Sequence, residues 1–239
     1  MYVKEKSWKI FDEIYVTYDR INQILSFGQD RSWRRFVAKH LPTSSSLRLL
    51  DLASGTCDQL IACMESSAQI ESAIALDLSA NMLEIGRKKL QSKPYRNQVE
   101  IVIGDAQSPP FPDSFFDAIT FSFGIRNLND PIRGLQEIKR LLKPQGKALI
   151  LEFSLPKNPI RPFHLLYLRY ILPHIGTLLS KNKEAYRYLH TTIEAFPYGN
   201  AFCSMMHDAG FASVQSIPLA LGAVTLYVGS TIPAYTLRY

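Results

Sequence analysis

The 239-residue sequence lacks a long uninterrupted hydrophobic run, a glycine-rich phosphate loop and an apolar leader. It has only three cysteines. An odd number without paired spacing argues against a disulfide framework or a zinc site, and it fits a reducing compartment. The most apolar stretch, residues 163–179, is interrupted by Arg169 and Pro173, whereas a membrane-spanning helix needs about 20 mostly apolar residues. Residues 1–6 include Lys4, Glu5 and Lys6 and do not open the apolar core that a secretory signal has. We therefore expect a cytoplasmic protein.

The charged residues show a moderate basic excess without an arginine-rich run. Lysine and arginine total 27 against 21 acidic residues, a net charge of +6. This excess suits an anionic ligand or an acidic membrane surface, and we expect no nucleic-acid partner. His190 and His207 lack neighbours at metal-ligand spacing, so we expect no metal site. The hydrophobic content of 46% is that of an ordinary globular protein.

Short apolar runs alternate with amphipathic segments from Leu47 onward, a pattern typical of a mostly parallel, doubly wound α/β sheet. Seven strands are predicted: from Leu47, and over residues 73–77, 99–104, 117–122, 147–153, 212–219 and 223–228. Helices are predicted over residues 32–40, from Asp58, and over residues 80–91, 130–142 and 200–209, with further N-terminal helices. We predict one domain over residues 1–239, with a helical cover (1–46), an α/β core (47–154), a helical insertion (155–196) and a closing helix and strands (197–239).

The stretch from Leu49 to Asp58 predicts the first strand–turn–helix unit of the sheet, where nucleotide-like ligands bind outside the strand ends. Its turn holds one glycine, Gly55, whereas a dinucleotide-binding turn has three, which disfavours a pyrophosphate ligand. Asp77 lies 22 residues later, at the end of the second predicted strand, where it can accept hydrogen bonds from both ribose hydroxyls. Asp105 follows the third strand and suits an adenine amine. One such carboxylate is equally typical of a helix cap, but the ordered set indicates an S-adenosylmethionine pocket.

These motifs resemble the class I methyltransferases, specifically the menaquinone/ubiquinone-biosynthesis C-methyltransferase family. The most specific matching segments are Leu25-Ser26-Phe27-Gly28, Phe123-Gly124-Ile125-Arg126-Asn127 and Tyr186-Arg187-Tyr188-Leu189. The resemblance covers nearly the whole chain and implies a Rossmann-like fold with S-adenosylmethionine as cofactor. It further implies cofactor contacts at the turn and strand ends, namely Gly55, Thr56, Asp77, Asp105, Ala106 and Ser122.

The sequence departs from the family pattern in the cofactor turn. Cys57 replaces the usual second glycine, and Ser54 stands where cysteine or glycine is common. A Cβ at position 57 costs little in helical backbone and more where φ is positive, and in the second case weaker cofactor binding is expected. Cys57 is either a small hydrophobic filler or a redox-sensitive thiol at a helix N-terminus.

The loop after the fourth predicted strand carries the residues that we assign to catalysis, Arg126 and Asn127. Carbon methylation of a quinol needs stabilisation of the charge on a ring oxygen, and an arginine that stays protonated supplies it. A role for Arg126 as base, and a structural ion pair with the helix after Asp130, are the alternatives. Tyr18, together with Asp19, is expected to complete the pocket or to orient Arg126.

The resemblance implies a polyprenylated quinol substrate, with demethylmenaquinol converted to menaquinol. A polyprenyl methoxy-benzoquinol of ubiquinone biosynthesis is the alternative, and a non-catalytic S-adenosylmethionine-binding or assembly protein is the rival from another class. The apolar insertion, with Arg161, Arg169, Lys181 and Lys183 nearby, suits a lid that admits the tail. We expect it to rest as a peripheral contact on the inner face of the membrane. Its exposed surface is also a candidate homodimer interface.

Overall fold

The computed structural model describes residues 7–44, 46–67, 69–174 and 183–232. Its centre is a seven-stranded sheet in the order β3-β2-β1-β4-β5-β7-β6. Strand β7 pairs antiparallel with β5 and β6, and the other pairs are parallel. This confirms the predicted mostly parallel, doubly wound sheet. The strands are β1 (Leu47–Leu52), β2 (Ile70–Asp77), β3 (Val99–Ile103), β4 (Phe116–Ser122), β5 (Leu142–Phe153), β6 (Ser213–Leu219) and β7 (Val224–Ser230).

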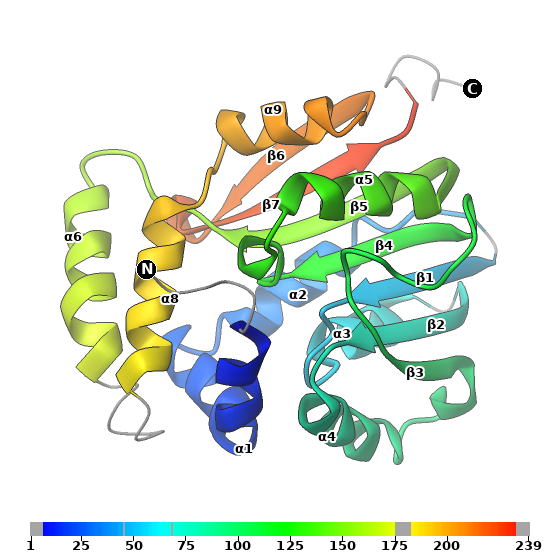
Figure 1. Ribbon diagram of the computed structural model, residues 1–239, viewed down its shortest axis with the longest axis horizontal. Coiled ribbons are helices and arrows are strands. Elements are labelled where there is room, and N and C mark those ends of the chain that lie inside the picture. The colour runs from blue at the N-terminus through cyan, green and yellow to red at the C-terminus, as the bar shows by residue number, and fades with distance from the viewer. Residues whose placement is uncertain (1–6, 45, 68, 175–182, 233–239) are drawn as a thin grey trace.

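Helices cover both faces of the sheet and extend beyond one end of its strands (Figure 1). Those along the sheet are α2 (Asp30–Ala38), α3 (Asp58–Ser66), α4 (Ala80–Leu90), α5 (Pro131–Leu141) and α9 (Asn200–Asp208). Those beyond the strand ends are α1 (Ser7–Leu25), α6 (Arg161–Leu166), the π-helical turn η4 (Tyr167–Ile171) and α8 (Lys183–Ala195). Short 3-10 turns are η2 (Arg96–Gln98), η3 (Ile125–Asn127) and η5 (Ala220–Gly222).

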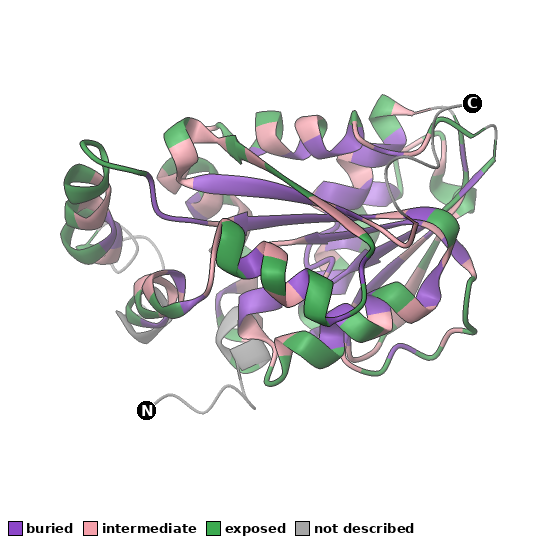
Figure 2. Ribbon diagram, turned by 90° about the horizontal axis from the view of Figure 1, so that it is seen from above, coloured by how far each residue is buried: buried purple, intermediate pink, exposed green. Residues whose placement is uncertain are grey.

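Strand β1 is buried on both faces, as expected for a central parallel strand. Leu50 and Leu52 belong to one hydrophobic core, and Leu47 and Leu49 belong to the core on the other face. Buried strands lie between helices whose outer faces are exposed (Figure 2). The order of strands reverses between β1 and β4, and in such sheets ligands bind outside the strand ends at this point.

A third hydrophobic cluster joins α1 to the late insertion. It contains Ile14 and Ile21 of α1, Leu168 of η4 and Ile193 of α8. The phenol of Tyr167 also donates a 2.7 Å hydrogen bond to the carbonyl of Leu25. The N-terminal cover and the insertion therefore pack together beside the carboxyl ends of the strands.

Most element boundaries agree with the sequence-based prediction within three residues, and β5 is the main exception. It begins at Leu142, directly after α5, whereas the prediction began at Lys147. Pro144 and Gly146 predict a turn, and Gln145 has a φ of 70°, but the backbone passes through a shift in register and keeps its pairing with β4. The Asp130–Pro131 cap of α5 is confirmed, since the Asp130 carboxylate accepts the amide of Arg133.

Candidate active site

Three adjoining cavities lie at the carboxyl ends of the central strands. The cofactor cavity has a volume of about 310 Å³ and is bounded by the ends of β1, β2, β3 and β4. The apolar cavity, of about 300 Å³, lies among α1, α2, α6, η4 and α8. A small cavity of about 20 Å³ lies beside Gly55 and Ser122. Phe123 lines the first two cavities and Tyr18 lines all three, so Tyr18 marks the place where they meet.

The cofactor cavity collects most of the residues that the sequence predicts to hold the cofactor. Asp77 accepts the amide of Gly55 and the amide of Ser79, each at 2.8 Å, which fixes its carboxylate at the end of β2. Burial raises the pKa of Asp77 above its ordinary value. Asp105 accepts the amide of Gln107 at 2.8 Å. The predicted residues that line this cavity are Gly55, Asp77, Asp105, Ala106 and Ser122.

The chemistry of these walls fits an adenosine ligand. Gly55 has a φ of 53°, where glycine is favoured, and without a Cβ it leaves the cavity wall open. Carboxylates at the ends of β2 and β3 suit ribose hydroxyls and an exocyclic amine respectively. Direct contact of these residues with the cofactor stays a prediction.

Thr56 does not line the cofactor cavity itself, and its contact with the cofactor stays a prediction. Its hydroxyl donates to Asp19 at 2.6 Å and accepts from the ammonium of Lys89 at 3.0 Å, and its residue lines the small cavity. Lys89 also pairs with Asp19 and Asp58, each at 2.6 Å. The expectation that Asp19 orients Arg126 is therefore wrong, because Asp19 fastens α1 to the turn and to α4.

A second attachment holds α1 over the cofactor cavity. The carboxylate of Asp12 accepts hydrogen bonds from the hydroxyl of Ser79 and from the amide of Asn81, the latter at 3.0 Å. Together with Asp19, it connects one face of α1 to the elements that form the cavity wall. These contacts place Tyr18 between the two larger cavities.

Arg126 lies at the inner end of the apolar cavity and forms a buried ion pair with Glu152. The two side chains are only 3% and 1% exposed, and Nη1 of Arg126 lies 2.8 Å from Oε1 of Glu152. The same nitrogen donates to the carbonyl of Phe123 at 2.6 Å, while Nε is buried and has no hydrogen-bond partner among the described residues. Burial raises the pKa of Glu152, and the charge of Arg126 opposes this rise.

The partner of Arg126 differs from the structural alternative that the sequence offered. That alternative paired it with the helix after Asp130, but its carboxylate partner comes from the end of β5. Strands β4 and β5 are neighbours, and Ser122 pairs with Leu151, so the loop after β4 begins beside Glu152. The acidic residue in an otherwise apolar strand end was the available signal for this pair.

Asn127 lines the cofactor cavity, and Tyr18 lines both this cavity and the apolar one. The amide oxygen of Asn127 accepts the phenol of Tyr188, on α8, at 3.1 Å. Tyr18 hydrogen-bonds to the side chain of Asn22, and burial raises the pKa of its phenol, which keeps it a neutral donor. The predicted catalytic residues therefore gather where the cofactor and apolar cavities meet, and Tyr188 joins them without having been predicted as a site residue.

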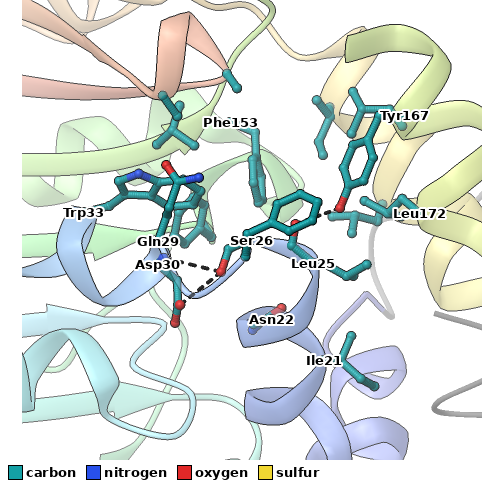
Figure 3. Close-up of a pocket in the computed structure, with 18 of the residues that line it drawn as sticks. Ile21, Asn22, Leu25, Ser26, Gln29, Asp30, Trp33, Phe153, Tyr167 and Leu172 are labelled. Atoms are coloured by element: carbon teal, nitrogen blue, oxygen red, sulfur yellow. Dashed lines mark hydrogen bonds between the residues drawn. The ribbon is translucent and has the colours of Figure 1, made fainter. Parts of the chain in front are cut away.

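The apolar cavity is walled mainly by hydrocarbon and aromatic side chains. Figure 3 shows Ile21, Leu25, Phe153, Tyr167 and Leu172 arranged around its interior. The rings of Phe123 and Phe153 lie 4.5 Å apart, and the guanidinium of Arg126 is centred 5.2 Å from the Phe153 ring. Such a cavity suits a flat, apolar ligand with a polar group at its inner end.

Cys57 adopts the left-handed backbone for which the family's glycine is suited, with a φ of 64°. Its side chain is buried in the core that contains Leu49 and Leu60, and burial raises the pKa of its thiol. A buried thiol with a raised pKa is unreactive, so the structure supports the hydrophobic filler over the redox-sensitive thiol. Ala53 and Phe123, with φ values of 47° and 58°, are likewise left-handed at the ends of β1 and β4.

The fold and the arrangement of cavities define a class I S-adenosylmethionine-dependent methyltransferase. A solved methyltransferase of this type from Thermotoga maritima has a TM-score of 0.64 at 21% identity, with 95% of this chain and 100% of that chain covered. Another, from Methanococcus maripaludis, has a TM-score of 0.62 at 19% identity and covers 90% and 91%. These similarities support the fold.

The family follows from the sequence comparisons. The chain belongs to the ubiE/COQ5 methyltransferase family, whose model matches residues 1–231. It is 39% identical to the ubiquinone/menaquinone biosynthesis C-methyltransferase UbiE of Geotalea daltonii, over 94% of this chain and 96% of the relative. It is 41% identical to the demethylmenaquinone methyltransferase of Clavibacter sepedonicus, over 92% and 88%. Within the described residues, no helix combines the length and hydrophobicity needed to cross a bilayer.

Proposed function

We propose that this methyltransferase converts demethylmenaquinol to menaquinol by methylating a carbon of the naphthoquinol ring. The observation that carries this proposal is the position of Arg126. It lies at the inner end of an apolar cavity that meets the cofactor cavity at Tyr18 and Phe123. Relatives from Clavibacter sepedonicus and Bacteroides fragilis, 41% and 38% identical, are named demethylmenaquinone methyltransferases.

The residues at the junction favour attack by a ring carbon. S-adenosylmethionine, when bound, supplies an electrophilic methyl group on a sulfonium. Arg126 places a permanent positive charge at the end of the apolar cavity, where it stabilises negative charge on a ring hydroxyl oxygen and so raises electron density on the neighbouring carbon. Tyr18 contributes a neutral phenol that can donate to a ring oxygen.

Glu152 holds Arg126 in place without lining either large cavity. A buried guanidinium with no counter-charge would be costly, and the carboxylate at 2.8 Å offsets this cost while fixing the orientation of the fork. Nη1 is occupied by Glu152 and Phe123, so any ring oxygen must approach another part of the guanidinium. We assign Arg126 to electrostatic stabilisation and Glu152 to its positioning.

The remainder of the apolar cavity accommodates the proposed polyprenyl tail, and the outer surface around it suits an anionic bilayer. Phe163 and Tyr170 of the insertion are 73% and 60% exposed, and Leu166 lies between them on the same helical face. Phe27, which lines the cavity, is 78% exposed. The net charge of +6 complements an acidic lipid surface. Arg169 of the predicted basic rim is paired with Glu194, while Lys181 and the side chain of Lys183 lie outside the described residues.

Paired neutralisation of Arg126 and Glu152 tests the catalytic assignment. Arg126→Gln alone would leave a buried carboxylate unpaired, so the variant to use is R126Q/E152Q. We expect kcat for the naphthoquinol to fall by about 100-fold or more, the usual effect of removing a donor that stabilises an oxyanion. Affinity for S-adenosylhomocysteine, measured by calorimetry, should stay unchanged. Near-normal turnover by this variant would remove Arg126 from the mechanism.

Flotation with vesicles containing anionic phosphatidylglycerol at low salt tests the membrane surface. We expect the unaltered chain to float with the vesicles and the F163S/Y170S variant to remain behind. The matched control is Ile103→Ser, which should float normally. Ile103 lies on the far edge strand, β3, and is 64% exposed. Failure of the unaltered chain to float would refute the membrane contact, and a dimer lost only in F163S/Y170S would assign this face to a second copy of the chain.

A benzoquinol of ubiquinone biosynthesis is the second candidate substrate. The relatives from Geotalea daltonii and Geotalea uraniireducens carry names that include both quinone classes. Both quinols present ring hydroxyls and an apolar tail to the same chemistry. Competition between the two reduced quinones for one enzyme sample separates them, and we expect the naphthoquinol to have the higher kcat/KM.

A further inference from the structure

Helix α2 carries a buried arginine that forms no ion pair with the described part of the chain. Arg34 is only 9% exposed, and its Nε is buried without a hydrogen-bond partner. Within the residues that the structure describes, no carboxylate lies within ion-pair distance of its guanidinium. Burying a cation without a counter-charge is costly. Arg126, by comparison, is paired with Glu152. Asp51 interacts with Arg34 electrostatically but does not come within ion-pair distance, so the guanidinium is left available to an anion supplied from outside the chain.

Arg34 lies where such an anion can reach it. Arg34 lines the apolar cavity, the small cavity beside Gly55 and an open polar groove among α1, α2, α3 and α4. The guanidinium carbon is 5.6 Å from the centroid of the Phe123 ring, which supports it from one side. Gly55 and Ser122 line both the small cavity and the cofactor cavity, so a ligand that fills the cofactor cavity passes directly into the space beside Arg34.

The small cavity presents charges of both signs. Besides Arg34, it is lined by Asp51 and Asp58. The Asp51 carboxylate accepts the hydroxyls of Ser54 and Thr120, each at 2.6 Å, and Asp58 is paired with Lys89. A guanidinium facing carboxylates across a space the size of one small group complements a zwitterion, which carries an ammonium and a carboxylate on one carbon.

We propose that Arg34 binds the α-carboxylate of the methyl donor, with its α-ammonium on the side of Asp51 and Asp58. This assignment rests on the placement of the donor's adenosine in the cofactor cavity. A ring oxygen of the quinol is the other anion within reach of Arg34. The carboxylates of Asp51 and Asp58 would repel such an oxygen. The amino acid part of the methyl donor, by contrast, carries an ammonium for these carboxylates and a carboxylate for Arg34. Arg34 is then a cofactor-anchoring residue that sets the reach of the sulfonium toward Tyr18 and the apolar cavity.

Two ligands that differ in one group test the assignment directly. One is S-adenosylhomocysteine, and the other is its decarboxylated form, 5′-deoxy-5′-(3-aminopropylthio)adenosine, which keeps the ammonium. We expect the unaltered chain to bind the first more tightly in calorimetry. In Arg34→Met, affinity for S-adenosylhomocysteine should fall by about 10- to 100-fold, as for loss of a charged hydrogen bond. Affinity for the decarboxylated ligand should not fall, and Arg34→Lys should recover part of the loss.

Controls separate a binding role from a structural one. Arg35→Met replaces an exposed neighbour on the same helix and should alter neither affinity. Because Arg34 is buried without an ion pair among the described residues, and Met keeps an unbranched apolar stem, R34M should unfold in urea at no lower midpoint than the unaltered chain. Equal weakening of both ligands would overturn the proposal, as would unchanged affinities with a raised KM for the quinol. If the unaltered chain bound neither ligand, the cofactor assignment and the proposed function would fail instead.

Discussion

Gly86 of α4 and Cys57 of the cofactor turn share one space, so we expect substitutions at the two positions to depend on each other. A Cβ added at Gly86 would lie 2.4 Å from the sulfur of Cys57 and 3.2 Å from its Cβ. Cys57 in turn occupies left-handed backbone, with φ at 64°. The cysteine stands where the family has a glycine. Its sulfur fits only because Gly86 of α4 has no side chain.

The expected energies follow from these contacts. Gly86→Ala alone would overpack the site at a cost of about 1–3 kcal/mol, against a helix-propensity gain of about 1 kcal/mol. Cys57→Gly alone relieves about 1–2 kcal/mol of left-handed backbone cost, but it loses a similar free energy from the buried apolar side chain. In C57G/G86A the clash with the sulfur is gone, and the nearest remaining contact is the carbonyl carbon of Thr56 at 3.3 Å. Gly86→Ala should then become neutral or stabilising, a coupling of about 2 kcal/mol.

Urea unfolding of the four proteins, followed by circular dichroism, measures this coupling. We expect the double variant to be more stable than the sum of the single effects, and Gly86→Ala to change sign between the two backgrounds. The positive φ of Cys57 is the case in which the sequence leads us to expect weaker cofactor binding, but its side chain faces the hydrophobic core, so we expect affinity for S-adenosylhomocysteine to change little in C57G. Additivity of the two substitutions within about 0.5 kcal/mol would refute the shared space.

Three further predictions concern single residues. Burial raises the pKa of Asp51 to about 6 from 3.8. The folded state therefore holds the proton of Asp51 up to a higher pH than the unfolded state does. The contribution of Asp51 to the unfolding free energy should fall by about 3 kcal/mol as pH rises from about 4 to 6. Asp51→Asn should remove that part of the pH dependence in urea titrations, and an unchanged slope would contradict the assignment. Asp77→Ala should weaken S-adenosylhomocysteine by about 10-fold or more in calorimetry, and unchanged affinity would exclude it from the site. Tyr188→Phe removes the 3.1 Å bond to Asn127 and should lower kcat by about 3- to 10-fold with little change in melting temperature; full activity would mean that the bond does not support catalysis.

The sheet and the cofactor cavity could be predicted from the sequence because their signals are local. Buried parallel strands are nearly continuous apolar runs, and an acidic residue at the end of the second strand lies at a fixed distance from the turn. Asp77 and Gly55 confirm this geometry through a direct hydrogen bond. Thr56 shows the limit of such signals. Its hydroxyl is taken by Asp19 and Lys89, which come from segments 37 and 33 residues away.

The residues around the apolar cavity depend on tertiary contacts that no local pattern contains. Glu152 meets Arg126 only because β4 and β5 pair side by side. In the sequence, Arg34 is one of several basic residues on an amphipathic helix. The sequence does not show that Arg34 is buried, because its burial depends on how α2 packs over the ends of the strands. Tyr188 reaches Asn127 because α8, the last helix of the insertion, packs against η3 after β4.

We propose that the chain methylates a ring carbon of a polyprenylated naphthoquinol, and one experiment tests this directly. The direct measurement is incubation with trideuteromethyl-labelled S-adenosylmethionine and reduced demethylmenaquinone, beside a reduced polyprenyl methoxy-benzoquinone, followed by mass analysis of the lipid products. We predict that demethylmenaquinol gains one trideuteromethyl group on its ring carbon and that R126Q/E152Q, still able to bind the donor, abolishes this gain. Unlabelled quinols from a chain that binds S-adenosylhomocysteine would contradict it.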